Sequence, residues 1–172
     1  PARALALGIA GRALDRAGDL LGALRYHEEA LALNRAIGNN SLQALNLNSQ
    51  AVLYARTGDA EQAVARFEES LALSRASGYR AGELQALGNL GVAYKNLGEL
   101  DRALDMYGQA LAQILAEKSN PVGDIGYFGV TFGMKAKSQD ALEPYKPVNW
   151  DQVPTGLKDA DGYWTTIHSG TL

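Results

Sequence analysis

His27 is the first residue whose type suggests chemistry, because it opens the segment HEEALAL on an expected helix. A zinc site built on one helix needs a second histidine four residues away, on the same face. Position 31 holds Leu31 instead. The sequence therefore predicts no metal site here.

The other reactive side chains do not form a catalytic pattern. Glu28 and Glu29, like Glu68 and Glu69, are adjacent on expected helices and so point in different directions. His168 stands in a segment with no visible serine, histidine and acid arrangement. The chain has no cysteine, and the Gly-x-Gly and Gly-Lys-Thr phosphate loops are missing. We therefore expect no enzyme and no cofactor.

Charge and hydropathy exclude two further kinds of partner. A formal net charge of -3 gives no basic field that would attract a phosphate backbone, so we expect no nucleic acid. No stretch approaches the roughly 20 consecutive apolar residues that a membrane-spanning helix needs, so we expect no membrane insertion. A protein or peptide partner remains.

An internal repeat of 40 residues organises the first two thirds of the chain. Gly18, Gly58 and Gly98 are each 40 residues apart. The same step relates further alanines and leucines: Ala23, Ala63 and Ala103; Leu7, Leu47 and Leu87; Leu31, Leu71 and Leu111. This regularity indicates stacked copies of one supersecondary unit.

Each unit has the pattern of two helices. Apolar and small residues three and four apart, such as Leu87, Leu90 and Tyr94, form the stripe of the first helix. A glycine then permits the left-handed turn, and an acidic residue follows at the positive start of the second helix. Because one pair cannot bury its apolar face alone, we expect the pairs to stack into a solenoid.

The pattern resembles the tetratricopeptide repeat family, in the 40-residue form of kinesin light chains and LGN-like scaffolds. The residues that carry the resemblance are the small residues Gly11, Ala51 and Gly91, the aromatic Tyr54 and Tyr94 with Leu14 in the first unit, and the ring position His27, Phe67 and Tyr107. The resemblance implies an all-α solenoid of three repeats and about six helices. We place repeats at about 2–38, 42–78 and 82–116, within a domain of residues 1–116. It also implies a protein–protein interaction scaffold, and a packed role for His27.

In that family the first helices line the concave side, where asparagines bind the backbone of a peptide. The segments LNLNSQAVLY and LGNLGVAYKN resemble that wording. An amide offers both a donor and an acceptor to an extended chain, and a cation can hold an acidic side chain or a terminal carboxylate. The hypothesis is a peptide-binding groove whose partner-binding residues are Arg12, Arg16, Asn48, Arg56, Asn89 and Lys95.

The composition changes after residue 116. All ten arginines lie before this point, whereas five of the six lysines and both tryptophans lie after it. We expect a strand near 122–130, a helix over 131–142, a loop with one short helical turn, and a final strand near 165–172. This is an incomplete α/β fragment.

The segment from about 112 to 172 resembles an early part of the solute-binding proteins of bacterial ABC importers, of the iron or polyamine type. The similar wording is VGDIGYFG, EPYKP and IHSGTL. The resemblance implies ligand-binding residues Gly129, Val130 and Thr131, although a fragment of one lobe forms no complete pocket.

Two origins are therefore expected in one chain, joined at the helix of ALAQILAEK. The alternative function is a fragment of such a periplasmic protein, with the repeats as the foreign part. The resemblance of residues 1–116 implies a cytoplasmic location, whereas the resemblance of residues 117–172 implies a periplasmic one. Unpaired strand edges in 117–172 also predict self-association.

Overall fold

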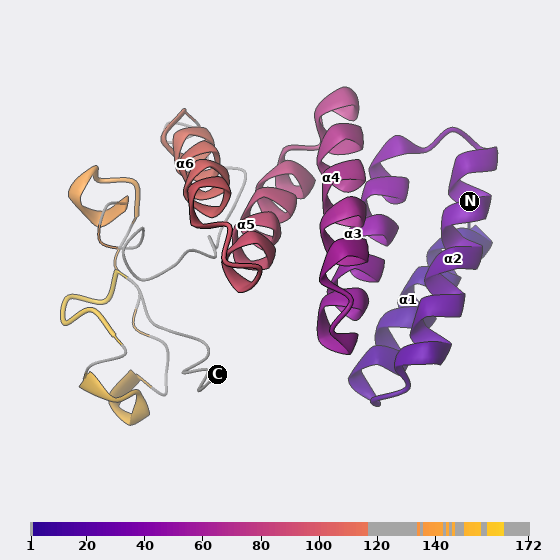
Figure 1. The fold of residues 1–172 in the computed structure, drawn as a ribbon, viewed down its shortest axis with the longest axis horizontal. Coiled ribbons are helices and arrows are strands. Elements are labelled where there is room, and N and C mark those ends of the chain that lie inside the picture. The colour runs from indigo at the N-terminus through magenta and orange to yellow at the C-terminus, as the bar shows by residue number, and fades with distance from the viewer. Residues whose placement is uncertain are drawn as a thin grey trace.

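The computed structural model describes residues 2–116, 134, 136–142, 144, 146, 150–155 and 158–163. Six α-helices account for the first range (Figure 1). They are α1 (Ala2–Arg16), α2 (Leu20–Ala36), α3 (Asn40–Thr57), α4 (Ala60–Ser77), α5 (Arg80–Asn96) and α6 (Leu100–Ala116).

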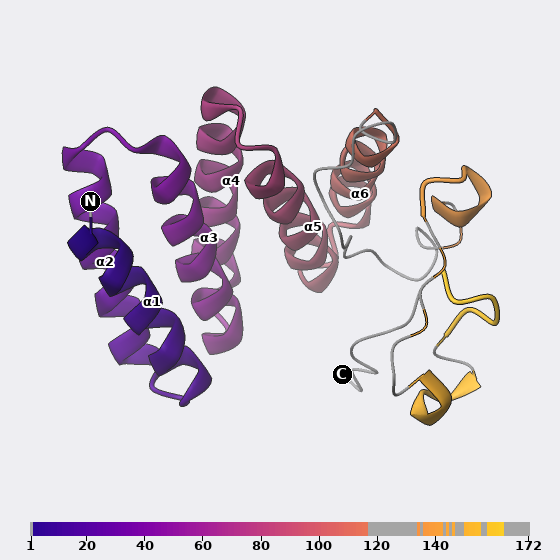
Figure 2. The same cartoon turned by 180° about the vertical axis from the view of Figure 1, so that it is seen from behind.

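The helices form three antiparallel hairpins, α1/α2, α3/α4 and α5/α6, which follow one another along the array (Figures 1 and 2). Each helix packs against the next one in the chain, from α1 to α6. In addition, α3 contacts both α1 and α5. The predicted all-α architecture of helical hairpins is confirmed for this part of the chain.

Glycines make the turns because the backbone there is left-handed. The φ angles are 87° at Gly18, 69° at Gly38, 86° at Gly58, 66° at Gly78 and 79° at Gly98. Residues with a Cβ rarely adopt these angles. The glycines that the repeat places at turns therefore adopt the left-handed backbone that the turns require.

The residue after a turn glycine often caps the next helix. Oδ1 of Asp19 accepts a hydrogen bond from the backbone N–H of Gly22 at 2.8 Å, and Oδ1 of Asp59 accepts one from Gln62 at 3.1 Å. These bonds satisfy amides that the first helical turn leaves without partners. The third hairpin differs, because Glu99 pairs with Arg102 at 2.9 Å.

The repeated small and apolar residues form the core. Ala23, Ala63 and Ala103 are 0%, 0% and 3% exposed. One continuous cluster runs from the second hairpin into the third, and it includes Phe67, Leu87, Leu90, Tyr94 and Tyr107. Burial of the alanines confirms that paired helices approach closely at these positions.

Leu7 departs from its column. Leu47 and Leu87 are fully buried, at 0% and 1% exposure, whereas Leu7 is half-buried. Leu47 and Leu87 face a preceding hairpin, whereas the described residues include no hairpin before α1. Among these residues Leu7 therefore lacks the neighbour that covers Leu47 and Leu87.

The described part of 117–172 contains little regular structure. The short 3₁₀ turn η1 (Trp150–Gln152) matches the predicted helical turn in the loop. The helix predicted over 131–142 is too long, because it ends at Ser138 and Asp140 takes a left-handed φ of 54°. No strand occurs among the described residues, and both predicted strands lie outside them. The α/β fragment therefore has no support here.

Candidate protein-interaction surface

The first helices of the three hairpins form the inner side of the array. Contacts connect α3 with α1 and with α5, whereas no such contacts connect α2, α4 and α6 with one another in the described chain. Closer spacing of α1, α3 and α5 makes their side the concave one. All six predicted partner-binding residues lie within these helices, and Arg16 is the last residue of α1.

Asn48 and Asn89 bind each other across this inner side. Nδ2 of Asn89 on α5 donates a hydrogen bond to Oδ1 of Asn48 on α3 at 3.0 Å. Asn48 is 5% exposed and Asn89 is half-buried. The predicted pair of amides is thus a contact between successive repeats.

This bond engages the amide nitrogen of Asn89 and the amide oxygen of Asn48, and it leaves the other two polar atoms of the pair unused. Within the described residues, Nδ2 of Asn48 and Oδ1 of Asn89 have no hydrogen-bond partner, and neither is sealed from solvent. An amide side chain carries both functions. Helices α3 and α5 therefore present a donor group and an acceptor atom beside the hydrogen bond that joins the two amides.

Arg56 lies against Asp15 of the preceding repeat. Its Nη1 donates to Oδ1 of Asp15 in an ion pair that connects α3 with α1. Arg56 was predicted to hold an acidic group of a partner. In the structure that acidic group comes from the chain itself.

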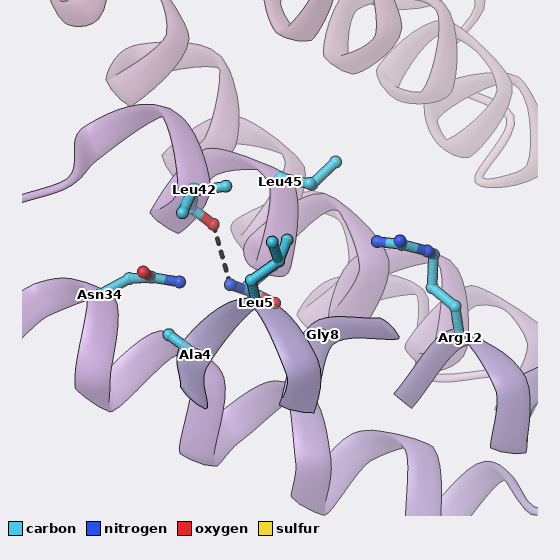
Figure 3. Close-up of a pocket in the computed structure, with 8 residues that line it drawn as sticks. Ala4, Leu5, Gly8, Arg12, Asn34, Leu42 and Leu45 are labelled. Atoms are coloured by element: carbon cyan, nitrogen blue, oxygen red, sulfur yellow. Dashed lines mark hydrogen bonds between the residues drawn. The ribbon is translucent and has the colours of Figure 1, made fainter. Parts of the chain in front are cut away.

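Arg12 lies at a small pocket between α1 and α3 (Figure 3). The lining residues are Ala4, Leu5, Gly8, Arg12, Asn34, Leu42, Leu45 and Asn46. Asn34 lies at the other end from Arg12, and its Oδ1 is buried without a hydrogen-bond partner among the described residues. The pocket has room for about one water molecule, so it is no small-molecule site.

Arg16 and Lys95 are exposed, at the ends of α1 and α5. No ion pair of either residue occurs within the described part of the chain. Together with the exposed Arg12, they place positive charge at both ends of the inner side. These three cations therefore differ from Arg56, which already forms an ion pair with Asp15.

His27 is packed in the first hairpin, as its column predicted. It is 2% exposed, and its Nδ1 lies 3.2 Å from Oδ1 of Asn46. Nδ2 of Asn46 donates to the carbonyl of Leu42 at 2.9 Å, so Oδ1 faces His27 as an acceptor. Burial is the largest influence on His27 and lowers its pKa below the usual value.

Sequence reasoning missed the buried amides of α3. Gln43, Asn46 and Gln50 are 8%, 5% and 2% exposed. The signal was present, because Asn46 and Gln50 occupy columns that hold Ala86 and Leu90 one repeat later. A polar residue in an apolar column indicates a buried polar group, and α3 carries two of them, whereas Gln43 shares its column with Arg3 and Glu83.

Other kinds of site find no support in the described chain. It contains no cluster of metal-binding side chains. None of its helices has the length and apolar character needed to cross a bilayer. The predicted ligand residues Gly129, Val130 and Thr131 lie outside the described residues.

Comparison with known proteins agrees with the repeat. Residues 40–114 match the family model described as tetratricopeptide repeat. A solved structure, the TPR domain of Arabidopsis FLU, aligns with a TM-score of 0.61 at 20% identity, over 65% of this chain and 94% of that one. No curated protein matches the chain.

These findings support tetratricopeptide repeats over residues 40–114 and the fold of a TPR domain over 65% of the chain. At 20% identity the Arabidopsis domain shows a shared fold and nothing more. Neither match names a kinesin light chain, an LGN-like protein or a solute-binding protein. Those finer resemblances, and self-association through 117–172, stay predictions.

Proposed function

We propose that the inner side of α1, α3 and α5 binds an extended segment of a partner protein. In this proposal residues 1–116 form the interaction domain, with repeats at 2–38, 42–78 and 82–116, and residues 117–172 are a separate segment. The resemblance of that segment to solute-binding proteins adds no activity to the proposal, because neither comparison supports it.

The observation that carries the proposal is the free donor and acceptor beside the Asn48–Asn89 bond. An extended backbone presents one N–H and one C=O for each residue, which these two groups complement. The hydrogen bond between Asn89 and Asn48 holds both side chains in place. Less rotamer freedom is then lost on binding.

The unpaired cations add a preference for acidic segments. Arg12, Arg16 and Lys95 are exposed, and they lie on the helices that form the inner side. A carboxylate of the bound segment gains charge-assisted hydrogen bonds from an arginine or lysine. Arg56 is expected to contribute less, because Asp15 already occupies it.

The test is binding of an array of extended peptides that differ in the number and position of acidic residues. The best peptide is then titrated against the full chain and against the double variant Asn48→Ala/Asn89→Ala. Removing both amides leaves neither side chain with an unsatisfied partner. Two lost hydrogen bonds at about 0.5–1.5 kcal/mol each predict roughly tenfold weaker binding or more.

Gln62→Ala is the matched control, since it removes an exposed amide from the outer helix α4. It should leave the affinity unchanged. Equal affinity of the wild type and the double variant, with both folded by circular dichroism, would refute the proposal.

A further inference from the structure

The last helix of the described hairpins, α6, carries exposed apolar side chains. Leu100 and Leu104 of α6 are 60% and 53% exposed. Val92 of α5 and Leu97 in the turn between these helices are 45% and 41% exposed. We call these four residues the α6 end face.

The repeat shows what covers an equivalent face. Val52 and Val64, one repeat before Val92 and Leu104, are partly buried against the core cluster that contains Leu87 and Leu90 of α5. The first helix of the next hairpin, α5, packs against both α3 and α4, so it covers this face. By the 40-residue step, the α6 end face has the shape to receive an amphipathic helix.

The charges beside the α6 end face indicate which kind of helix would bind there. On the inner side, Asp15 of one repeat pairs with Arg56 of the next, 41 residues later. Lys95 occupies the position of Asp15 two repeats on, with the sign of the charge reversed. It has no ion pair within the described residues. A helix that covers the α6 end face would therefore need a carboxylate to pair with Lys95. That carboxylate would stand at the position that Arg56 occupies in α3.

We propose that the α6 end face docks an amphipathic α-helix of a partner protein, with an acidic residue opposite Lys95. This surface adjoins the inner side used for extended segments, and Lys95 lies where the two meet. The apolar stripe of the partner helix covers Leu100 and Leu104, and its carboxylate fixes the register.

A second copy of the chain fits poorly. Its α1 would place Arg16 at the position of Arg56, directly opposite Lys95. Like charges at that distance oppose docking.

The chain's own continuation also lacks the required features. In the same register the covering segment would be 120–137, and its first part, 120–133, contains Pro121 and four glycines, a composition that disfavours a helix. This segment would place Ala136 opposite Lys95, which provides no charge. A helix from another protein is the occupant that both shape and charge favour.

The probe is a helix-stapled peptide of residues 80–96, because α5 is the helix that covers the equivalent face of α4. Asn96 of this peptide corresponds to Arg56, so two versions are made, Asn96→Glu and Asn96→Lys. The Glu version should bind the full chain about two- to fivefold more tightly, as expected for one exposed ion pair. Lys95→Glu in the full chain should reverse the order.

Leu104→Asp should abolish binding of both peptides, since it places a charge in the apolar contact. Asn48→Ala/Asn89→Ala should bind the peptides like the wild type. Failure of this inference and failure of the proposed groove are therefore separate results.

Single-cysteine variants show directly whether the face is open, because the chain has no cysteine of its own. Leu104→Cys should react with a thiol reagent many times faster than Val64→Cys, which α5 covers. Added Asn96→Glu peptide should slow the labelling of Leu104→Cys alone.

Three results would overturn the proposal. The first is no peptide binding, or binding that Leu104→Asp does not change. The second is slow labelling of Leu104→Cys in the monomer, which assigns the face to the chain's own C-terminal part. The third is a dimer that Leu104→Asp dissociates, which assigns it to a second copy.

Discussion

Each hairpin brings one small residue against one ring. A Cβ added at Gly91 would lie 2.3 Å from Tyr107, and one added at Gly11 would lie 2.8 Å from Nε2 of His27. The second hairpin has Ala51 and Phe67 at these positions. The close approach of two helices is therefore set by individual side chains.

We predict that Gly91→Ala destabilises the protein by about 1–3 kcal/mol in urea unfolding, the usual cost of an overpacked core. Tyr107 is 5% exposed, so its ring is buried in the core. Gly108→Ala is the control, because nothing lies within 4 Å of its added Cβ. It should stabilise α6 by roughly 0.5–1 kcal/mol, through helix propensity. A neutral Gly91→Ala would show that this contact is loose.

The buried His27 predicts an acid-sensitive stability. Its folded-state pKa is lowered below 6.5, chiefly by burial. Protons therefore bind the unfolded chain more readily, so stability falls as the pH drops from about 6.5 toward the folded pKa. Above about 6.5 both states are neutral and the effect is absent.

The variant His27→Phe/Asn46→Ala copies the pair Phe67 and Ala86, which stands at the same two positions one repeat later. Unfolding free energies at about pH 7.5 and about pH 5 should differ less for this variant than for the wild type. Asn46→Ala alone, which keeps the histidine, is the comparison. Identical pH dependence in wild type and double variant would exclude His27 as the source.

At the scale of helices, the caps explain where the second helices begin. Asp59 accepts a hydrogen bond from Gln62 at the start of α4. We predict that Asp59→Ala lowers the unfolding free energy by about 1 kcal/mol, whereas Asp59→Asn, which keeps the acceptor, has little effect. Equal stability of all three proteins would show that the cap contributes nothing.

The helices could be predicted from the sequence because their signals are local. Turn glycines such as Gly58 and Gly78, and acids such as Asp19, lie beside the boundaries they set. The helix expected over 131–142 ends earlier than predicted for a local reason as well, because Asp140 adopts a left-handed backbone that glycine usually provides.

At the scale of the whole molecule, the candidate site could be predicted only in part. Repeat columns and the family resemblance placed Asn48, Asn89 and Arg56 on the inner helices. They did not reveal that Asn48 binds Asn89, or that Arg56 binds Asp15. Both contacts cross between hairpins at a spacing of 41 residues. Such contacts depend on how successive hairpins are rotated, which the periodicity of one chain does not contain.

The most direct test of the account is a nuclear magnetic resonance map of the full chain with the best acidic peptide from the array. The side-chain amide signals of Asn48 and Asn89 should shift, along with backbone signals of α1, α3 and α5. Signals of the outer helices α2 and α4 should stay in place. Shifts confined to the outer helices, with the two asparagine amides unmoved, would contradict the account.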